Sequence, residues 1–116
     1  MAGVQKSWAI IIGIILLLVG IIGFFSGDAV LEIFPVNLSH NIVHLITGAV
    51  FLWAGFASAE KAKMANKWLG IIYILVAVIG FLGYLTFLNV QGGNDPDNWL
   101  HVAIGVVSAG VGFLSK

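Results

Sequence analysis

Four long apolar runs separated by short polar stretches dominate the hydrophobic pattern of this chain. None of the runs contains a charged residue, and they cover Trp8–Phe25, Ile42–Ala59, Trp68–Leu88 and Trp99–Leu114. A helix that crosses the hydrocarbon core needs about 20 residues, within a range of about 17 to 25. Because backbone groups in lipid need internal partners, runs of this length predict helices rather than strands. We expect an all-α membrane protein, a single domain of four transmembrane helices over residues 1–116, in which the fourth helix gains a residue or two at each end.

The composition agrees with a lipid environment. Hydrophobic residues make up 60% of the chain and charged residues 9%, and the mean hydropathy is +1.09. Such a short chain could not bury this much apolar surface in water. The first run is longer than a typical signal core and is followed by the poor cleavage site Ser26-Gly27-Asp28, so we expect it to be retained. The absence of cysteine excludes thiolate sites, and the absence of arginine argues against nucleic acid as a partner.

The few charged residues divide between alternate ends of the runs. All basic residues precede the first run, lie between the second and third, or end the chain: Lys6, Lys61, Lys63, Lys67 and Lys116. Four of the five acidic residues lie in the other two connections: Asp28, Glu32, Asp95 and Asp97. Lysine in short loops marks the cytoplasmic face. The pattern predicts cytoplasmic termini and a cytoplasmic loop over residues 61–67, with Trp8, Trp68 and Trp99 at the membrane interface.

One polar motif occurs twice. The frame Asn-x-x-x-Asn-x-x-His-x-x-x-Gly covers residues 37–48 and again residues 94–105, an interval of 57. The first and third runs align at an interval of 60, which pairs Trp8 with Trp68. These matches predict an internal repeat, with repeat one at about 1–60 and repeat two at about 61–116. The chain would then form two tandem helical hairpins of the same orientation, a parallel repeat.

Glycines recur at matched positions of the two halves. Small residues let membrane helices approach closely, so we expect these positions to be packing contacts. They are Gly20, Gly23, Gly48 and Gly55 in the first half, and Gly80, Gly83, Gly105 and Gly112 in the second.

The candidate site is built from the polar residues of the repeated motif. Asn41 and His44 share one helical face with Gly48, and Asn98 and His101 share one with Gly105, so both histidines should point into the bundle near its outer surface. Three further residues could supplement them: His40, Asp95 and Asp97. Asp95 followed by Pro96 is typical of a helix start, and Asn37 or Ser39 could cap the second helix. The connection over residues 26–40 could lie over this cluster.

Several roles remain open for the Asn/His pairs. They could be structural clasps between the hairpins, or ligands of a haem-type or chlorophyll-type tetrapyrrole or of a transition metal. They could instead line a conduction path. No recognisable nucleophile triad, phosphate loop or His-Glu-x-x-His motif occurs, so we do not expect an enzyme.

The chain resembles a bacterial family of small four-helix membrane proteins known only as a domain of unknown function. Paired glycines in an early helix, Asn-x-x-His before the second helix and an Asn-Trp-Leu-His stretch before the fourth carry the likeness: Gly20, Gly23, Asn41, His44, Gly48, Asn98, Trp99, Leu100, His101 and Gly105. The resemblance implies a bacterial inner membrane or a thylakoid-type membrane, and no activity. We therefore expect a structural or accessory membrane subunit in the lipid bilayer, beside other subunits or copies of itself. The alternatives are a cofactor-binding protein and a small transporter or channel.

Overall fold

The computed structural model of the chain describes residues 2–27, 29–30, 34–90, 92–93 and 95–115. In this part the chain forms four α-helices, a two-stranded antiparallel ribbon and one short 3-10 helix: α1 (Ala2–Phe25), β1 (Ala29–Val30), β2 (Phe34–Pro35), α2 (Leu38–Ala57), α3 (Ala59–Phe81), η1 (Thr86–Leu88) and α4 (Pro96–Leu114). The sequence predictions for Asp28, Glu32, Asn94 and Lys116 fall outside the described residues.

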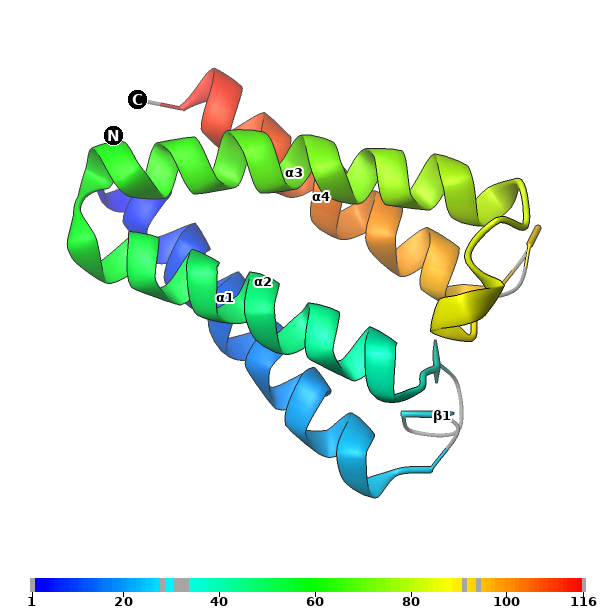
Figure 1. Cartoon of the computed structure of the whole chain (residues 1–116). Coiled ribbons are helices and arrows are strands. Elements are labelled where there is room, and N and C mark those ends of the chain that lie inside the picture. The colour runs from blue at the N-terminus through cyan, green and yellow to red at the C-terminus, as the bar shows by residue number, and fades with distance from the viewer. Residues whose placement is uncertain (1, 28, 31–33, 91, 94, 116) are drawn as a thin grey trace.

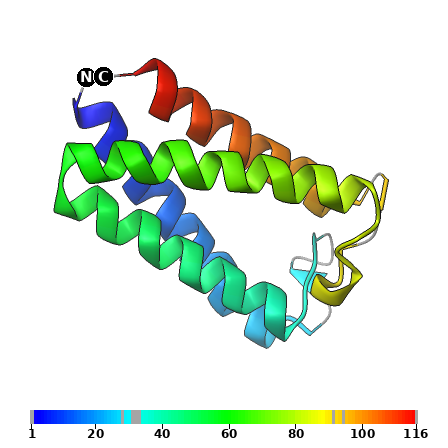
Figure 2. The ribbon, with the colours of Figure 1, turned by 45° about the horizontal axis from the view of Figure 1, so that its top comes forward.

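All four α-helices are long and apolar enough to cross a membrane, as the hydrophobic runs predict. The α1 helix packs mainly on α2, and α3 packs mainly on α4. Both views place the two termini together at one end, whereas the ribbon, η1 and the start of α4 lie at the other (Figures 1 and 2). The longest dimension is 38 Å, which exceeds the roughly 30 Å of a hydrocarbon core.

Two helix boundaries differ from the prediction. The lysine-rich segment 61–67 is not a loop, because Ser58 alone separates α2 from α3 and its side chain accepts a hydrogen bond from Lys61 N, capping α3. At its other end α3 stops at Phe81 and not at Leu88, because Gly83 takes a left-handed φ of 86° that ends the helix. The start of α4 is as predicted, with Asp95 as N-cap and Pro96 in the first turn.

Most of the predicted glycines lie where two helices of one hairpin touch. A Cβ built on Gly48 would lie 2.8 Å from Leu17 N, and one on Gly105 would lie 2.7 Å from Ile74 N. Built on Gly55 or Gly112, it would meet the backbone of the paired helix; on Gly20, it would meet Leu45; on Gly23 and Gly80, it would meet the side chains of Asn41 and Asn98. Gly83 departs from the prediction, since nothing lies within 4 Å of an added Cβ and its role is the turn.

These contacts correct the predicted alignment of the first and third helices. Gly48 lies against Leu17 and Gly105 against Ile74; Gly23 lies against Asn41 and Gly80 against Asn98. Every partner in these pairs is displaced by 57 residues, on α1 and α3 as well as on α2 and α4. The contacts of α1 and α3 therefore correspond at an interval of 57 and not at the predicted 60, which was based on six matched residues, Trp8 with Trp68 among them.

A polar contact that the sequence analysis did not identify joins three helices at the end that holds the termini. Asn66 Nδ2 donates to Gln5 O and to Gln5 Oε1, at 3.0 and 2.9 Å, and Gln5 Nε2 donates to Val111 O and Ser115 O, at 2.8 and 3.0 Å. Both side chains are buried. This network ties α1 to α3 and α4 where the apolar core is made of small residues such as Ala9 and Ala62.

Candidate functional site

The three histidines of the chain converge at the end of the bundle opposite the termini. Asn37 caps α2 by accepting a hydrogen bond from His40 N at 2.9 Å, which sets His40 in the first turn. His44 follows one turn later on the same face, and His101 lies in the second turn of α4. Helix caps that the sequence predicts thus position all three imidazoles.

The imidazole rings of these histidines form one buried cluster. Ring centroids lie 4.4 Å apart for His40 and His44, 5.6 Å for His40 and His101, and 6.3 Å for His44 and His101. One nitrogen from each ring lies within 4.8 Å of the other two. None of the three is more than 2% exposed. The sequence motif predicts His40 only as a supplement to the other two histidines, whereas the structure gives it an equal place.

His40 is oriented by the segment around η1. Its Nδ1 lies 3.0 Å from Leu88 O, and because a carbonyl only accepts, Nδ1 carries the proton and donates. The lone pair of the neutral ring is then on Nε2. Asn37 Nδ2 donates to Phe87 O at 2.8 Å, and Asn89 Nδ2 donates to Val36 O at 3.0 Å. These bonds hold η1 against the start of α2.

His44 differs from His40 in its surroundings. Neither of its ring nitrogens has a hydrogen-bond partner among the described residues, and Nδ1 of His101 has none there either. Tyr73 packs on His101 with ring centroids 5.6 Å apart, and its hydroxyl hydrogen-bonds Thr47 Oγ1 at 2.7 Å. Buried imidazole nitrogens usually have a hydrogen-bond partner, so the surroundings of His44 call for an explanation.

Two cavities of similar size flank His44. One, of about 210 Å³, lies between α2 and α3 and is also lined by His40, His101, Thr47 and Tyr73. The other, of about 260 Å³, lies between α1 and α4 and has only apolar residues besides His44. Their linings correspond at the interval of 57 residues: Ile15 with Ile72, Leu16 with Tyr73, Val19 with Val76, Val43 with Leu100, and Thr47 with Ile104. Hydroxyl groups therefore occur in only one cavity of the pair.

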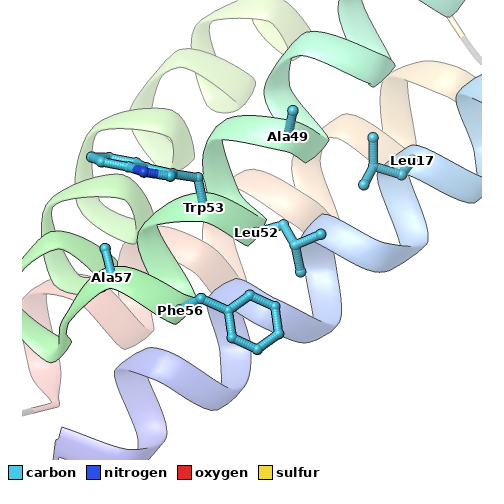
Figure 3. Close-up of a pocket in the computed structure, with 6 residues that line it drawn as sticks. All are labelled: Leu17, Ala49, Leu52, Trp53, Phe56 and Ala57. Carbon is cyan, nitrogen blue, oxygen red and sulfur yellow. The ribbon is translucent and has the colours of Figure 1, made fainter.

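A larger apolar groove of about 480 Å³ lies away from the histidines, on the outer surface of α1 and α2. Its lining is Leu17, Ala49, Leu52, Trp53, Phe56 and Ala57, with no titratable side chain (Figure 3). Trp53 and Phe56 are 62% and 68% exposed. A groove of this kind suits contact with lipid chains and contributes no chemistry.

The motif asparagines lie beside the cluster and fill space next to glycines. Asn41 is 3% exposed, lies against Gly23, and its Oδ1 has no hydrogen-bond partner among the described residues. Asn98 is fully buried against Gly80, and its Nδ2 donates to Gly93 O at 3.2 Å.

The two predicted acidic residues take different positions. Asp95 Oδ1 accepts a hydrogen bond from Asp97 N at 2.9 Å as part of the helix cap. The Asp97 side chain is fully buried, and neither carboxylate oxygen has a hydrogen-bond partner in the described part of the chain. Asp97 lies one turn before His101, as His40 lies one turn before His44. A buried carboxylate is costly unless it is paired with a cation, coordinates one or takes up a proton.

This geometry fits a metal ion better than a tetrapyrrole. Zinc-type sites place imidazole nitrogens 2.0–2.1 Å from the metal, so tetrahedral donor atoms are about 3.4 Å apart. The three nitrogens, now within 4.8 Å, need to approach by about 1.4 Å at most. A macrocycle, in contrast, would have to separate rings that contact one another. The flanking cavities of about 210 and 260 Å³ are also below the roughly 300 Å³ minimum for drug-sized ligands.

Comparison with known proteins identifies one family. Its sequence profile, described as a domain of unknown function (DUF4383), matches residues 6–114. No curated protein and no solved structure matches the chain.

Proposed function

We propose that this chain, which belongs to the DUF4383 family of unknown function, is an integral membrane protein that binds one transition-metal ion through His40, His44 and His101. The observation that carries the proposal is the position of three buried imidazole nitrogens within 4.8 Å of one another. Imidazole is a suitable ligand for zinc, copper, iron and nickel. Ionisable residues inside membrane segments are rare and usually functional.

Two surrounding features support a cation at this position. Metal-bound histidines commonly donate their second N–H to a backbone carbonyl, and His40 has this arrangement with Leu88 O. Three neutral imidazoles add no negative charge to balance a divalent ion. The carboxylate of Asp95, the N-cap of α4, acts electrostatically on His101 and can supply that charge.

The proposal predicts that the purified protein binds one metal ion per chain. Protein prepared in detergent, stripped with a chelator and reloaded with Co²⁺ should bind one equivalent and show the strong visible absorption of tetrahedral cobalt. Elemental analysis of the protein as isolated would identify the native metal. A matched variant is Ser39→Ala, an exposed neighbour of His40, which should bind equally well. Failure of the wild-type protein to bind any of Zn²⁺, Co²⁺, Cu²⁺ or Fe²⁺ would overturn the proposal.

The two hairpins are proposed to descend from one duplicated hairpin. The interval of 57 residues that relates the glycine contacts also relates the linings of the two cavities. At this interval Gly13, Ile14, Val19, Gly23 and Phe24 of the first hairpin have identical counterparts in the second. His40 corresponds to Asp97 at this interval. Divergence at this one position would leave three histidines and one carboxylate in place of a symmetric set.

We place the protein in a bacterial inner membrane or a thylakoid-type membrane, with both termini in the cytoplasm or its equivalent. Lys6, Lys61, Lys63 and Lys67 lie at the terminal end and support this orientation. The histidine site then lies near the outer face. The protein would act without catalysis of its own, in the bilayer beside other membrane subunits or copies of itself.

This orientation can be tested because the chain has no cysteine of its own. Ser39→Cys lies at the histidine end and Glu60→Cys at the terminal end, and both positions are exposed. In intact bacterial spheroplasts, a membrane-impermeant maleimide should label Ser39→Cys and not Glu60→Cys. Both should react after lysis. Labelling of Glu60→Cys in intact spheroplasts would reverse the assignment.

A further inference from the structure

Neither ring nitrogen of His44 has a hydrogen-bond partner among the described residues, and a bound metal ion would account for only one of the two. When one nitrogen of a neutral imidazole binds a metal, the other carries a proton and needs an acceptor. Leu88 O serves His40 in this way, whereas no described protein group serves His44. Because His44 lines two cavities, the acceptor can come from a molecule bound in one of them.

The cavity between α2 and α3 is the better match for such a molecule. It has the paired hydroxyl groups of Thr47 and Tyr73, whereas the equivalent positions of the other cavity are Ile104 and Leu16. Its remaining lining is apolar, including Val43, Ile72, Val76 and Phe87. Val43 on α2 and Ile72 on α3 are 38% and 48% exposed on the surface that faces lipid in a spanning helix bundle. A ligand would therefore enter from the hydrocarbon and not from water.

We propose that this cavity binds the head group of a membrane-soluble quinone or quinol, an inference that rests on the proposed metal site. An apolar cavity of about 150 Å³ holds a benzene ring, so about 210 Å³ holds a single substituted ring. A ring oxygen accepts the hydrogen bond from His44. Thr47 Oγ1 donates to Val43 O, so the proton between the two hydroxyls belongs to Tyr73. A second ring oxygen can replace Thr47 as the acceptor of this proton, or a quinol hydroxyl can donate to the Tyr73 oxygen. The hydrocarbon tail leaves through the exposed side of the cavity into lipid.

A bound water fits this site less well than a ring. It can satisfy the polar groups, but it occupies about 30 Å³ of the cavity of about 210 Å³ and leaves the apolar lining without contacts. A ring with two oxygens satisfies the same polar groups and fills the apolar remainder. The polar groups and the apolar lining of the cavity therefore both favour a ring with two oxygens.

The test uses photolabelling by a quinone. Zinc-loaded protein in phosphatidylcholine nanodiscs is irradiated with an azido-substituted decylbenzoquinone, with and without excess unmodified decylubiquinone, and labelled peptides are identified by mass spectrometry. We expect label on α2, α3 and the η1 segment that the competitor removes. Val76→Phe should fill this cavity and reduce the competed label at least tenfold. Val19→Phe, at the equivalent position of the other cavity, should leave it unchanged.

A second variant, Thr47→Ile, provides an independent test in case Val76→Phe does not fold. Thr47→Ile introduces the residue that the other cavity has at this position and should also weaken competed labelling. The protein could bind one zinc ion per chain and yet show labelling that the competitor does not reduce, or labelling spread over all lipid-facing helices. This result would overturn the quinone proposal and leave the metal-site proposal intact. Competed labelling of α2 and α3 in a protein that does not bind zinc would support the cavity and overturn the metal site. Labelling unaffected by either Val76→Phe or Thr47→Ile would assign the quinone elsewhere.

Discussion

Replacement of His44 by leucine is expected to abolish metal binding without weakening the fold. Loss of an outer-shell partner typically costs 10–100-fold in metal affinity, so loss of a ligand should cost more than about 100-fold. The His44 side chain is buried and makes no hydrogen bond within the described part of the chain. Removing a buried polar group that has no partner relieves its desolvation penalty, so the metal-free protein should be at least as stable as the wild type. Chelator competition with Zn²⁺ measures the affinity, and detergent unfolding in EDTA measures the stability.

His40→Leu is the matched variant that separates the two effects. It should lose metal binding to a similar extent, but it should also destabilise the metal-free protein by about 1–3 kcal/mol, because Leu88 O loses its hydrogen-bond donor. A His44→Leu protein destabilised as much as His40→Leu would favour a structural clasp. Unchanged zinc affinity in His44→Leu would remove this residue from the metal site.

The four helices could be predicted from the sequence, because the apolar composition indicates a lipid environment and the length of each apolar run matches a spanning helix. The lysine segment was wrongly predicted as a loop because charge ends an apolar run and does not end a helix. Ala62, Lys63, Met64 and Ala65 are all strong helix formers, so α3 continues through them to Ser58. The end of α3 needed the conformation of Gly83, which hydropathy does not report.

The candidate site was predicted in part. The matched glycines indicated that His44 and His101 face the interior, and the structure buries both. The equal place of His40 depends on η1 folding back over the start of α2, where Asn37 and Asn89 hydrogen-bond backbone carbonyls of distant residues. No helical period predicts such long-range contacts. Tyr73 could not be predicted for a related reason, because a tyrosine in an apolar run cannot be distinguished from an ordinary core residue.

A valine at Gly70 is expected to break the second hairpin. A Cβ added at Gly70 would overlap the backbone nitrogen of Ala109 on α4. Backbone atoms cannot rotate aside as a flexible side chain can, so α3 and α4 would have to separate along their contact. Overpacking costs about 1–3 kcal/mol where a core adjusts, and this site should reach or exceed the upper value. The same separation would move His101 away from His40 and His44 and weaken metal binding.

The control for this prediction is Gly110→Val on the facing helix. Both residues lie inside α-helices, so the change in helix propensity is the same in the two variants and cancels in the comparison. Nothing lies within 4 Å of a Cβ added at Gly110, because this position faces away from the bundle. Helicity in increasing concentrations of denaturing detergent, followed by circular dichroism, should place Gly110→Val near the wild type and Gly70→Val far below it. Equal stability of the two variants would contradict the close backbone contact between α3 and α4.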